Sequence, residues 1–214
     1  MTNDQCPIAY RRNGFRLGVV ILGAGASRRM SRPKLLLPWG ETSVLGHLLA
    51  VWKELHAEQI AVVCAAADQS MAKELERLGF SEDNRIMNPD PQRGMFSSIQ
   101  CAAGWQGWKT DLTHWAIVLG DQPHLRADTL RALLHFAATH PEKICQPSRH
   151  DRPRHPVFLP KTAFHRLQNT KARNLKEFLQ TEKDNIDLCL SDDPGLDLDL
   201  DTPADYEKAL GYSQ

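Results

Sequence analysis

Short apolar runs alternate with segments of helical periodicity along most of this chain, and this alternation limits the possible folds more than any other feature. Runs such as Leu17–Leu22 and residues 115–119 have the length and composition of strands buried on both faces. Segments such as residues 128–138 place leucine and alanine every three or four positions, which predicts amphipathic helices. The pattern predicts an α/β fold with a single doubly wound, mostly parallel sheet and helices on both of its faces.

The expected elements cover the chain from residue 17 onward. Strands are expected at residues 17–22, 60–66, 84–88, 115–119, 144–146, 156–159, 187–190 and 196–200, and helices at residues 42–54, 71–78, 94–105, 128–138, 163–167, 175–179 and in the C-terminal sequence DTPADYEKAL. Residues 1–15 show neither pattern and are expected to form a loose tail. The remainder, residues 16–214, has the size of one domain.

Charge and cysteine content narrow the class of protein. The 26 lysines and arginines balance the 26 acidic residues, so the chain lacks the net positive charge that proteins use to bind nucleic acid or anionic membranes. Its five cysteines are scattered without a CxxC pair, which argues against a zinc knuckle and fits a reducing compartment. The sequence shows no signal-peptide core and no apolar run of 18 residues, so we expect a cytoplasmic protein that binds neither membrane nor nucleic acid.

The loop after the first expected strand concentrates glycine and positive charge. The strand ends in the sequence GAG, residues 23–25, and four cations follow within ten residues: Arg28, Arg29, Arg32 and Lys34. A dinucleotide-binding fingerprint would need a third glycine at residue 28 and a helix there, but two prolines soon interrupt any helix. We expect the backbone N–H groups of this loop to wrap a triphosphate, with Arg29 and Lys34 adding charge; a solvated surface loop is the alternative.

The segment LGAGASRRMSRPKLLLPWG resembles the signature loop of the molybdopterin nucleotidyltransferases, among which the molybdenum cofactor cytidylyltransferases are the most similar. Ser31 departs from the glycine that is usual in this loop. The resemblance implies a Rossmann-type fold like that of the nucleotide-diphospho-sugar transferases. It also implies nucleotide binding by the residues of this loop that match the family, namely Leu22, Gly23, Ala24, Gly25, Ser27, Arg29 and Lys34.

The segment NPDPQRGMFSSIQ is similar to a second stretch of the same family. Gly94 permits close approach of the backbone to a ligand, and Ser97 and Ser98 stand at the start of an expected helix. On this resemblance all three belong to the nucleotide site, and Ser98 is the position that would contact the base or ribose. A purely structural capping role is the alternative for the two serines.

Two acidic segments complete the resemblance to the nucleotide site. Asp121 follows a buried strand in AIVLGDQPHL, where ligands of parallel sheets bind, although Asp-Gln-Pro is also a good turn sequence. In LDLDLDTPADY the alternation predicts a strand with Asp197, Asp199 and Asp201 on one side. The sequence itself offers Asp201 or Thr202 as the cap of the last helix. The family pattern implies that Asp121 and Asp199 bind Mg²⁺, or Mn²⁺, and that Asp201 is the cap. Asp197 is expected to be a solvated residue at a sheet edge.

The segment PSRHDRPRHPVFLP resembles a loop of the family that ends in GHPV. His155 matches this pattern, while Arg154 replaces the glycine and, with Arg149 and Arg152, adds positive charge. A later family element survives only partly in NTKAR, where Asn169 and Thr170 depart from the pattern and Arg173 remains. The resemblance implies that Arg154, His155 and Arg173 bind an acidic acceptor.

Together these segments imply a reaction in which CMP moves from CTP to the terminal phosphate of molybdopterin and pyrophosphate leaves. Arg29, Lys34 and Asp121 would be the catalytic residues, acting by positioning and by neutralising charge. The implied partners are CTP or another nucleoside triphosphate, a molybdopterin-type acceptor, and an enzyme of the xanthine dehydrogenase class or its chaperone. Because the acceptor is already an anion, the reaction requires no general base.

Three other functions remain open on the sequence. The same core could serve a guanylyltransferase or a sugar-phosphate nucleotidyltransferase, because the choice of base rests on similarity alone. The GxG sequence could belong to an oxidoreductase, and the departures from the family pattern are compatible with a non-catalytic nucleotide-binding relative. All nucleotidyl-transfer alternatives require that Asp121 and Asp199 meet, facing the cationic loop.

Overall fold

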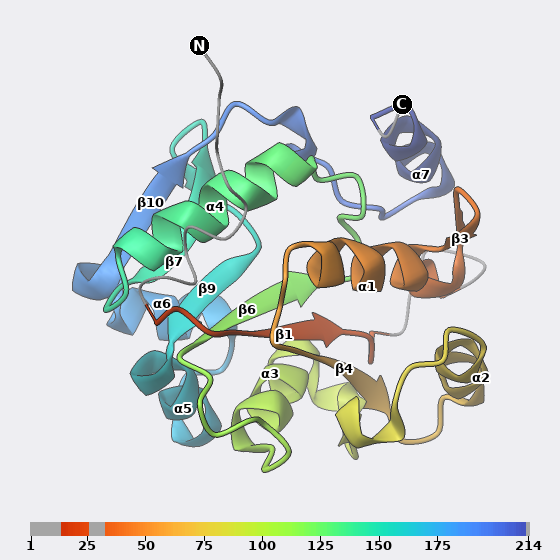
Figure 1. The fold of residues 1–214 in the computed structure, drawn as a ribbon, viewed down its shortest axis with the longest axis horizontal. Helices are drawn as coiled ribbons and strands as arrows, with labels where there is room; N and C mark the ends of the chain where they lie inside the picture. The colour runs from red at the N-terminus through yellow and green to blue at the C-terminus, as the bar shows by residue number, and fades with distance from the viewer. Residues whose placement is uncertain (1–13, 26–32, 213–214) are drawn as a thin grey trace.

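The computed structural model describes residues 14–25 and 33–212. Its centre is an eight-stranded sheet in which the strand order is β10-β7-β9-β6-β1-β4-β5 and β8 pairs with β7 (Figure 1). These strands are β1 (Leu17–Leu22), β4 (Gln59–Ala65), β5 (Arg85–Asn88), β6 (His114–Leu119), β7 (Ile144–Arg149), β8 (Arg152–Pro153), β9 (Val157–Pro160) and β10 (Ile186–Leu190). Within this sheet β8 and β9 run against the other strands, so the expected mostly parallel sheet is confirmed.

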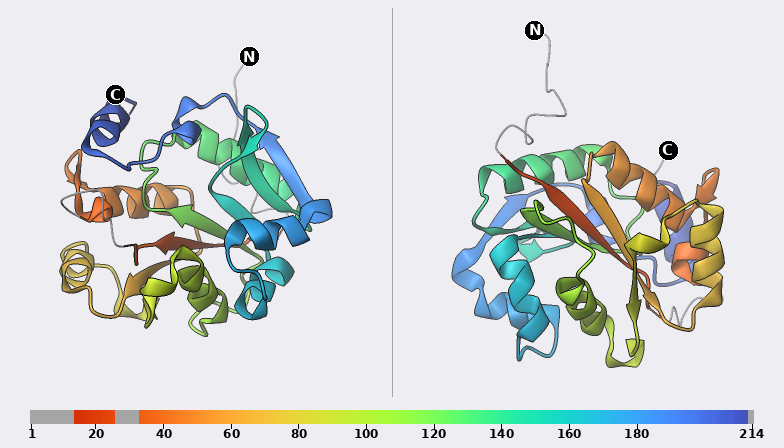
Figure 2. Two further views of the ribbon diagram at one scale, coloured as in Figure 1. Left: turned by 180° about the vertical axis from the view of Figure 1, so that it is seen from behind. Right: turned by 60° about the horizontal axis from the view of Figure 1, so that its bottom comes forward.

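Helices cover both faces of the sheet, as Figures 1 and 2 show. They are α1 (Val44–Glu54), α2 (Gln69–Arg77), α3 (Met95–Gly104), α4 (Ala127–Thr139), α5 (Lys161–Asn169), α6 (Leu175–Thr181) and α7 (Pro203–Leu210). Buried residues of α1, α2, α4 and α7 join one hydrophobic core, and those of α3, α5 and α6 join the other. Strand β1 contributes to both, because Val19 and Ile21 enter the first core and Val20 the second.

The order of the strands reverses between the neighbouring strands β1 and β6. From β1 the chain passes through α1 to β4 and then to β5 on one side, and it returns to place β6 on the other side of β1. The loops that follow the neighbouring carboxyl ends of β1 and β6 therefore leave in opposite directions. A crevice at such a reversal of strand order is the usual ligand site of an open α/β sheet.

The C-terminal helix α7 packs against a small hairpin. The hairpin pairs β2 (Pro38–Trp39) with β3 (Thr42–Ser43). Tyr206 of α7 donates a hydrogen bond to the Pro38 carbonyl, and its ring packs edge-on against Trp39 with centroids 6.2 Å apart. The hydroxyl of Thr202 and the carboxylate of Asp205 cap the helix reciprocally, so Thr202, and not Asp201, is the cap of the two that the sequence offered.

The expected strand at residues 196–200 is wrong. Residues Pro194–Asp197 form a short 3-10 helix, η6, and the chain beyond it runs to α7 without regular structure. The N–H of Leu200 donates to the Asp121 carbonyl oxygen, 3.0 Å away and beyond the end of β6, so this segment pairs with a loop and not with a strand. Its leucines are all buried, and its aspartates diverge to different partners. Alternation alone could not reveal that this segment pairs with the loop after β6 and not with a strand.

The expected tail also needs a correction at its end. Residues 1–13 lie outside the described residues, but Phe15, assigned to the tail, is only 3% exposed and stacks on His114 with ring centroids 4.2 Å apart. The folded core therefore begins before residue 16. None of the helices in the described part of the chain combines the length and apolar character that crossing a membrane requires.

Candidate active site

Leu35, which follows the cationic loop, packs between the carboxyl ends of β1 and β6. Leu35 lies in a 3-10 helix, η2 (Lys34–Leu36), and is 6% exposed. It packs so tightly on Gly120 that a β-carbon at this glycine would lie 2.8 Å from Leu35 Cδ2. Glycine after β6 thus makes room for Leu35, and the burial of Leu35 fixes the position of the neighbouring Lys34.

Lys34 extends from this anchored turn toward two carboxylates from distant parts of the chain. Its Nζ lies 2.7 Å from Asp201 Oδ1 and 3.6 Å from Asp121 Oδ2. The lysine side chain is 18% exposed, so the ammonium group is partly withdrawn from water while still reaching the surface. One cation therefore connects the loop after β1, the loop after β6 and the start of the C-terminal helix.

Asp121 and Asp199 lie on adjacent backbone segments that hydrogen-bond to each other. The Leu200 N–H donates to the Asp121 carbonyl oxygen at 3.0 Å, and Gln122 Nε2 donates to Asp199 Oδ1 at 2.9 Å. Burial, together with the negative charge of Asp199, raises the pKa of Asp121, and Lys34 opposes this rise. The structure therefore brings together the two carboxylates and the lysine that the sequence assigned to one site.

One oxygen of the Asp121 carboxylate has no hydrogen-bond partner in the described part of the chain. This oxygen, Asp121 Oδ1, is buried. A buried carboxylate oxygen without a partner, next to a second carboxylate, suits a hard divalent cation such as Mg²⁺ or Mn²⁺. No group of three metal-binding side chains exists in the described ranges, but Mg²⁺ commonly takes only one or two carboxylates and completes its shell with water and phosphate. The residues present fit such a cation.

A buried polar network, which the sequence analysis missed, holds these two loops in place. His124 Nε2 donates to the Gly195 carbonyl at 3.0 Å. The carboxylate of Asp193, 4% exposed, accepts from Thr129 Oγ1 at 2.7 Å and from the Gly195 N–H at 2.9 Å. Burial lowers the pKa of His124, which keeps the ring neutral as a donor. The only signal in the sequence was the turn-forming Asp-Pro-Gly at residues 193–195.

His155 lies beside Asp199 but not as a charged acceptor-binding group. Burial lowers its pKa to about 4, against the opposing effects of a hydrogen bond with the Ile117 backbone and of the charge of Asp199. The imidazole is therefore neutral at physiological pH. Its Nδ1 is buried without a partner in the described chain, so any contact with a ligand would be a neutral hydrogen bond.

The arginines that precede His155 meet at Asp197. Arg149 and Arg154 both contact the Asp197 carboxylate, Arg149 at Oδ2 and Arg154 at Oδ1. The expectation that Asp197 is a solvated edge residue is therefore wrong, because its side chain is 29% exposed and bound by two guanidinium groups. Burial raises the pKa of Asp197, but hydrogen bonds and charge from Arg154 and Arg149 outweigh this and lower it.

The two serines of the second family segment are internal in this structure. Ser97 and Ser98 are each 4% exposed, and both hydroxyl groups accept from Asn88 Nδ2, at 2.8 and 2.9 Å. This network ties the end of β5 to the first turn of α3. Gly94, in contrast, is exposed and has a φ of +88°, in the region that favours glycine. A role of the serines in nucleotide binding stays a prediction.

The remaining expected site residues are placed differently. Arg173 is 86% exposed and pairs with Glu177 of α6, 3.1 Å away, so no described contact joins it to Asp121 or Asp199. Its role toward the acceptor also stays a prediction. Gly23 follows β1 directly and donates its N–H to the Val63 carbonyl at 2.8 Å, with Ala24 and the exposed Gly25 after it. The expected site residues Ser27 and Arg29 lie outside the described residues.

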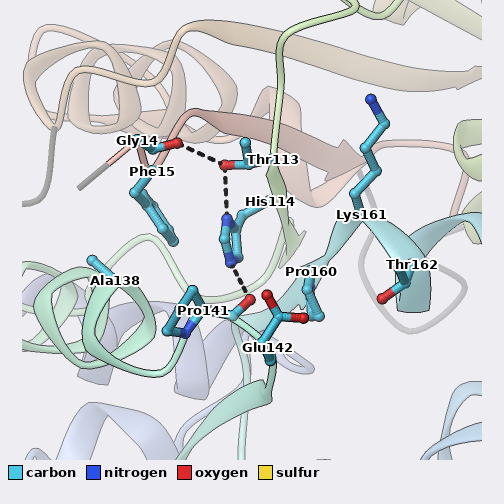
Figure 3. A pocket seen from close by; sticks show the side chains of 10 residues that line it. All are labelled: Gly14, Phe15, Thr113, His114, Ala138, Pro141, Glu142, Pro160, Lys161 and Thr162. Carbon is cyan, nitrogen blue, oxygen red and sulfur yellow. Dashed lines mark hydrogen bonds between the residues drawn. The ribbon is translucent and has the colours of Figure 1, made fainter.

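A hollow of about 290 Å³ at the opposite edge of the sheet does not form a second reactive site (Figure 3). Its central histidine, His114, begins β6 and is 5% exposed. The His114 Nε2 donates to the Pro141 carbonyl at 2.9 Å, and its Nδ1 lies 2.9 Å from Thr113 Oγ1. Burial lowers the pKa of His114. Both ring nitrogens contact other residues of the protein, so His114 has a structural role at the amino end of β6.

Comparison with known protein families identifies the family of the chain. The family described as MobA-like NTP transferase domain matches residues 19–186, which is most of the chain. The chain belongs to this family. The resemblance to molybdopterin nucleotidyltransferases is thereby confirmed at the level of the family, and its nucleotidyltransferase fold is confirmed by solved structures.

This MobA-like chain is similar to curated proteins and to solved structures. The bifunctional protein GlmU of Novosphingobium aromaticivorans is 33% identical over 121 residues, which are 55% of this chain and 25% of that protein. The chain thus spans about a quarter of the length of the curated relatives that it matches. Rv0371c from Mycobacterium tuberculosis H37Rv is 25% identical with a TM-score of 0.74, covering 92% of this chain and 98% of Rv0371c.

Two further structures share the fold. Molybdopterin-guanine dinucleotide biosynthesis protein A from Archaeoglobus fulgidus has a TM-score of 0.64 at 17% identity, covering 91% of this chain and 97% of its own. Rv0371c has also been crystallised in complex with manganese, with a TM-score of 0.65 at 23% identity, covering 92% of this chain and 98% of that chain. At these identities the two structures support the fold of the MobA-like chain and not its substrate.

Proposed function

We propose that this chain is a metal-dependent nucleotidyltransferase that moves CMP from CTP to the terminal phosphate of molybdopterin and releases pyrophosphate. The observation that carries the proposal is the meeting of Asp121, Asp199 and Lys34 at the carboxyl edge of the sheet, with Asp121 Oδ1 buried and unpaired in the described chain. Carboxylates and a lysine at such an edge suit the phosphates of a nucleotide.

In the proposed reaction an oxygen of the acceptor's terminal phosphate forms a bond to the α-phosphorus of the nucleotide. The bond from this phosphorus to the oxygen that bridges to the β-phosphate breaks, and pyrophosphate leaves with the electron pair. The attacking phosphate is already ionised, so no side chain has to remove a proton. This agrees with the neutral His155 and with the internal use of His124.

The side chains of the site act by position and charge. Asp121 and Asp199 would hold Mg²⁺ or Mn²⁺, which supplies positive charge against the α-phosphate when it is bound. Lys34 would contact the β- or γ-phosphate, and its position is set by the buried Leu35. Gln122 orients the Asp199 carboxylate through the hydrogen bond at 2.9 Å. Arg29 is proposed to hold the same phosphates from the loop after β1.

The choice of CTP and molybdopterin rests on the sequence resemblance, in which GDQP at residues 120–123 favours the cytidylyltransferases. The proposed protein partner of this chain is an enzyme of the xanthine dehydrogenase class, or the chaperone of such an enzyme. The second candidate is a nucleotidyltransferase that acts on a sugar phosphate, which the shared core leaves open. A guanylyltransferase on the same core is the third.

Nucleotide binding separates these candidates before any acceptor is needed. Melting temperatures are measured with CTP, GTP, ATP or UTP in the presence of Mg²⁺, because a ligand that binds only the folded state raises the melting temperature. CTP is expected to give the largest rise. An equal or larger rise with GTP or UTP would favour the corresponding alternative.

The reaction itself is tested by pyrophosphate release. Wild-type protein with CTP and Mg²⁺ is expected to release pyrophosphate only when molybdopterin is added. Asp121→Asn, which keeps the size of the side chain, is expected to lower the rate and to weaken Mn²⁺ binding measured by electron paramagnetic resonance. Release that occurs with a sugar phosphate instead, or not at all with any acceptor, contradicts the proposed reaction.

A further inference from the structure

The pair of arginines at Asp197 lies at the same level of the sheet as the proposed site. Cys145 of β7 is opposite Phe158 of β9, which is opposite Ala116 of β6, so four residues further along Arg149 is level with Gly120. Strands β7 and β6 are separated by β9 alone, which corresponds to about 10 Å. The arginine pair thus lies on the β7 side of the proposed site, away from the nucleotide loop on the β1 side.

The two guanidinium groups have more donors than Asp197 can satisfy. Each guanidinium carries five N–H groups in a planar fork, whereas a carboxylate offers two oxygens. Arg149 Nη1 and Arg154 Nη2 contact one oxygen each. The Nε groups of both arginines are buried and have no hydrogen-bond partner among the described residues. A tetrahedral phosphate, with oxygens pointing in several directions, would satisfy these donors better than the planar carboxylate does.

The space beside Arg154 and Asp197 can admit such a group. A hollow of about 440 Å³ is lined by His150, Arg152, Arg154 and Asp197. Arg152 is the β8 partner of Arg149 and is exposed, with no ion pair among the described residues. Arg149 and Arg152 are thus like charges directly opposite each other, an arrangement that destabilises a strand pair. Asp197 pairs with Arg149 and not with Arg152, so it offsets the positive charge of the hairpin tip only in part. Asp151, exposed at the turn, is the acidic residue of the hairpin itself.

We propose that Arg149 and Arg154 form a clamp for a phosphate group of the acceptor, and that Asp197 competes with this phosphate for the clamp. The inference rests on the proposed function, since it takes the acceptor to be the phosphorylated reactant on the β7 side. When the phosphate binds, the arginines exchange the carboxylate for it and the freed Asp197 turns to water. Arg152 adds charge at the rim.

Phosphate binding without turnover tests the clamp. The probe is inorganic phosphate, titrated into the protein while the Nε–Hε signals of Arg149 and Arg154 are followed by nuclear magnetic resonance. Asp197→Asn keeps the shape of the side chain but removes the competing charge, and it is expected to bind phosphate about tenfold more tightly than the wild type. Arg154→Gln is expected to lose phosphate-dependent shifts of Arg149. Unchanged phosphate affinity in a folded Asp197→Asn protein overturns the proposal.

Controls separate the clamp from general charge effects and from loss of folding. Asp128→Asn removes a carboxylate that pairs with Arg131, 2.9 Å away on the surface of α4, and is expected to leave phosphate affinity unchanged. If Asp197→Asn does not fold, Arg152→Gln carries the test, because it breaks no ion pair in the described chain; it is expected to weaken phosphate binding about threefold. An unchanged affinity in Arg152→Gln would then overturn the proposal.

The source of the phosphate is tested with CTP. If the clamp belongs to the acceptor site, saturating CTP leaves the two Nε–Hε signals in place and phosphate still shifts them. Competition between CTP and phosphate for these signals would assign the clamp to the nucleotide and overturn the inference. The outcome is separate from that of the proposed function: phosphate binding can be measured even if no transfer occurs, and transfer can occur while Asp197→Asn leaves phosphate affinity unchanged.

Discussion

Replacing Lys34 by methionine separates a catalytic lysine from a structural one. Methionine keeps the length of the side chain and removes the charge. At the 3.6 Å that separate Lys34 Nζ from Asp121 Oδ2, an effective dielectric constant of 20 gives a gross attraction of roughly 4 to 5 kcal/mol between unit charges. A phosphate oxygen at a similar distance would experience a comparable attraction. If about 1.4 kcal/mol of this appears in the transition state, Lys34→Met lowers the rate about tenfold.

The matched control is Asp201→Asn. Lys34 and Asp201 are 2.7 Å apart, and the two side chains are 18% and 43% exposed, so the pair contributes about 0.5 to 1 kcal/mol to stability. Both variants break this pair and are expected to lower the melting temperature by a similar, small amount. Only Lys34→Met removes the cation that we assign to the phosphates, so only this variant is expected to lose activity by about tenfold or more.

The assay is pyrophosphate release at saturating CTP, Mg²⁺ and molybdopterin, with melting temperatures measured on the same preparations. Asp201→Asn is expected to stay within about threefold of the wild-type rate. Wild-type turnover in Lys34→Met would refute the assignment of Lys34 to the transferred phosphates. Equal losses in the two variants would show that the reaction needs the ion pair and not the charge of the lysine by itself.

Three further variants test the supports of the site. Leu35→Ala removes a buried side chain and is expected to lower the free energy of unfolding by about 2 to 5 kcal/mol in urea denaturation, with loss of activity because Lys34 is no longer anchored. Gln122→Leu removes the donor to Asp199 Oδ1 and is expected to weaken Mn²⁺ binding while the melting temperature changes little. His114→Gln tests pH dependence. Burial lowers the pKa of His114 from 6.5, so below that pH the unfolded chain binds a proton that the folded chain does not. The melting temperature of the wild type should therefore fall on acidification from about pH 7.5 to about pH 5.5, and that of His114→Gln should fall less.

Each of these expectations can fail in a distinct way. A Leu35→Ala protein with wild-type activity would show that Lys34 finds its place without the buried anchor. Unchanged Mn²⁺ affinity in Gln122→Leu would mean that Asp199 needs no orienting donor. Identical pH profiles for the wild type and His114→Gln would assign the acid sensitivity to other buried histidines.

Local patterns were sufficient to predict the fold. The strands 17–22 and 115–119 and the helix 128–138 follow from apolar runs and helical spacing within a few neighbouring residues, and β1, β6 and α4 occupy nearly the same bounds. The position of Asp121 follows from the same logic, because the end of a buried parallel strand is where ligands bind.

Features that depend on distant partners could not be predicted in this way. The alternation at residues 196–200 is that of a strand, but whether a strand forms depends on a free sheet edge, which the sequence does not reveal. A serine such as Ser98 at the start of a helix can be a cap or a ligand-binding residue. Only the structure shows that its hydroxyl group accepts a hydrogen bond from Asn88. The pKa of His155, lowered to about 4, follows from burial that no sequence pattern around it indicates.

The five residues from Asp197 to Asp201 present three carboxylates to three different sets of partners. Asp197 pairs with Arg149 and Arg154. Asp199 accepts a hydrogen bond from Gln122, and Asp201 pairs with Lys34. Because neighbouring carboxylates of this segment are only two residues apart, we expect a movement of one to shift the backbone that carries the next. On the two proposals above, phosphate binding at Arg149 and Arg154 would then alter the position of Asp199 at the proposed metal site, and the rate would depend on the order in which the two reactants bind.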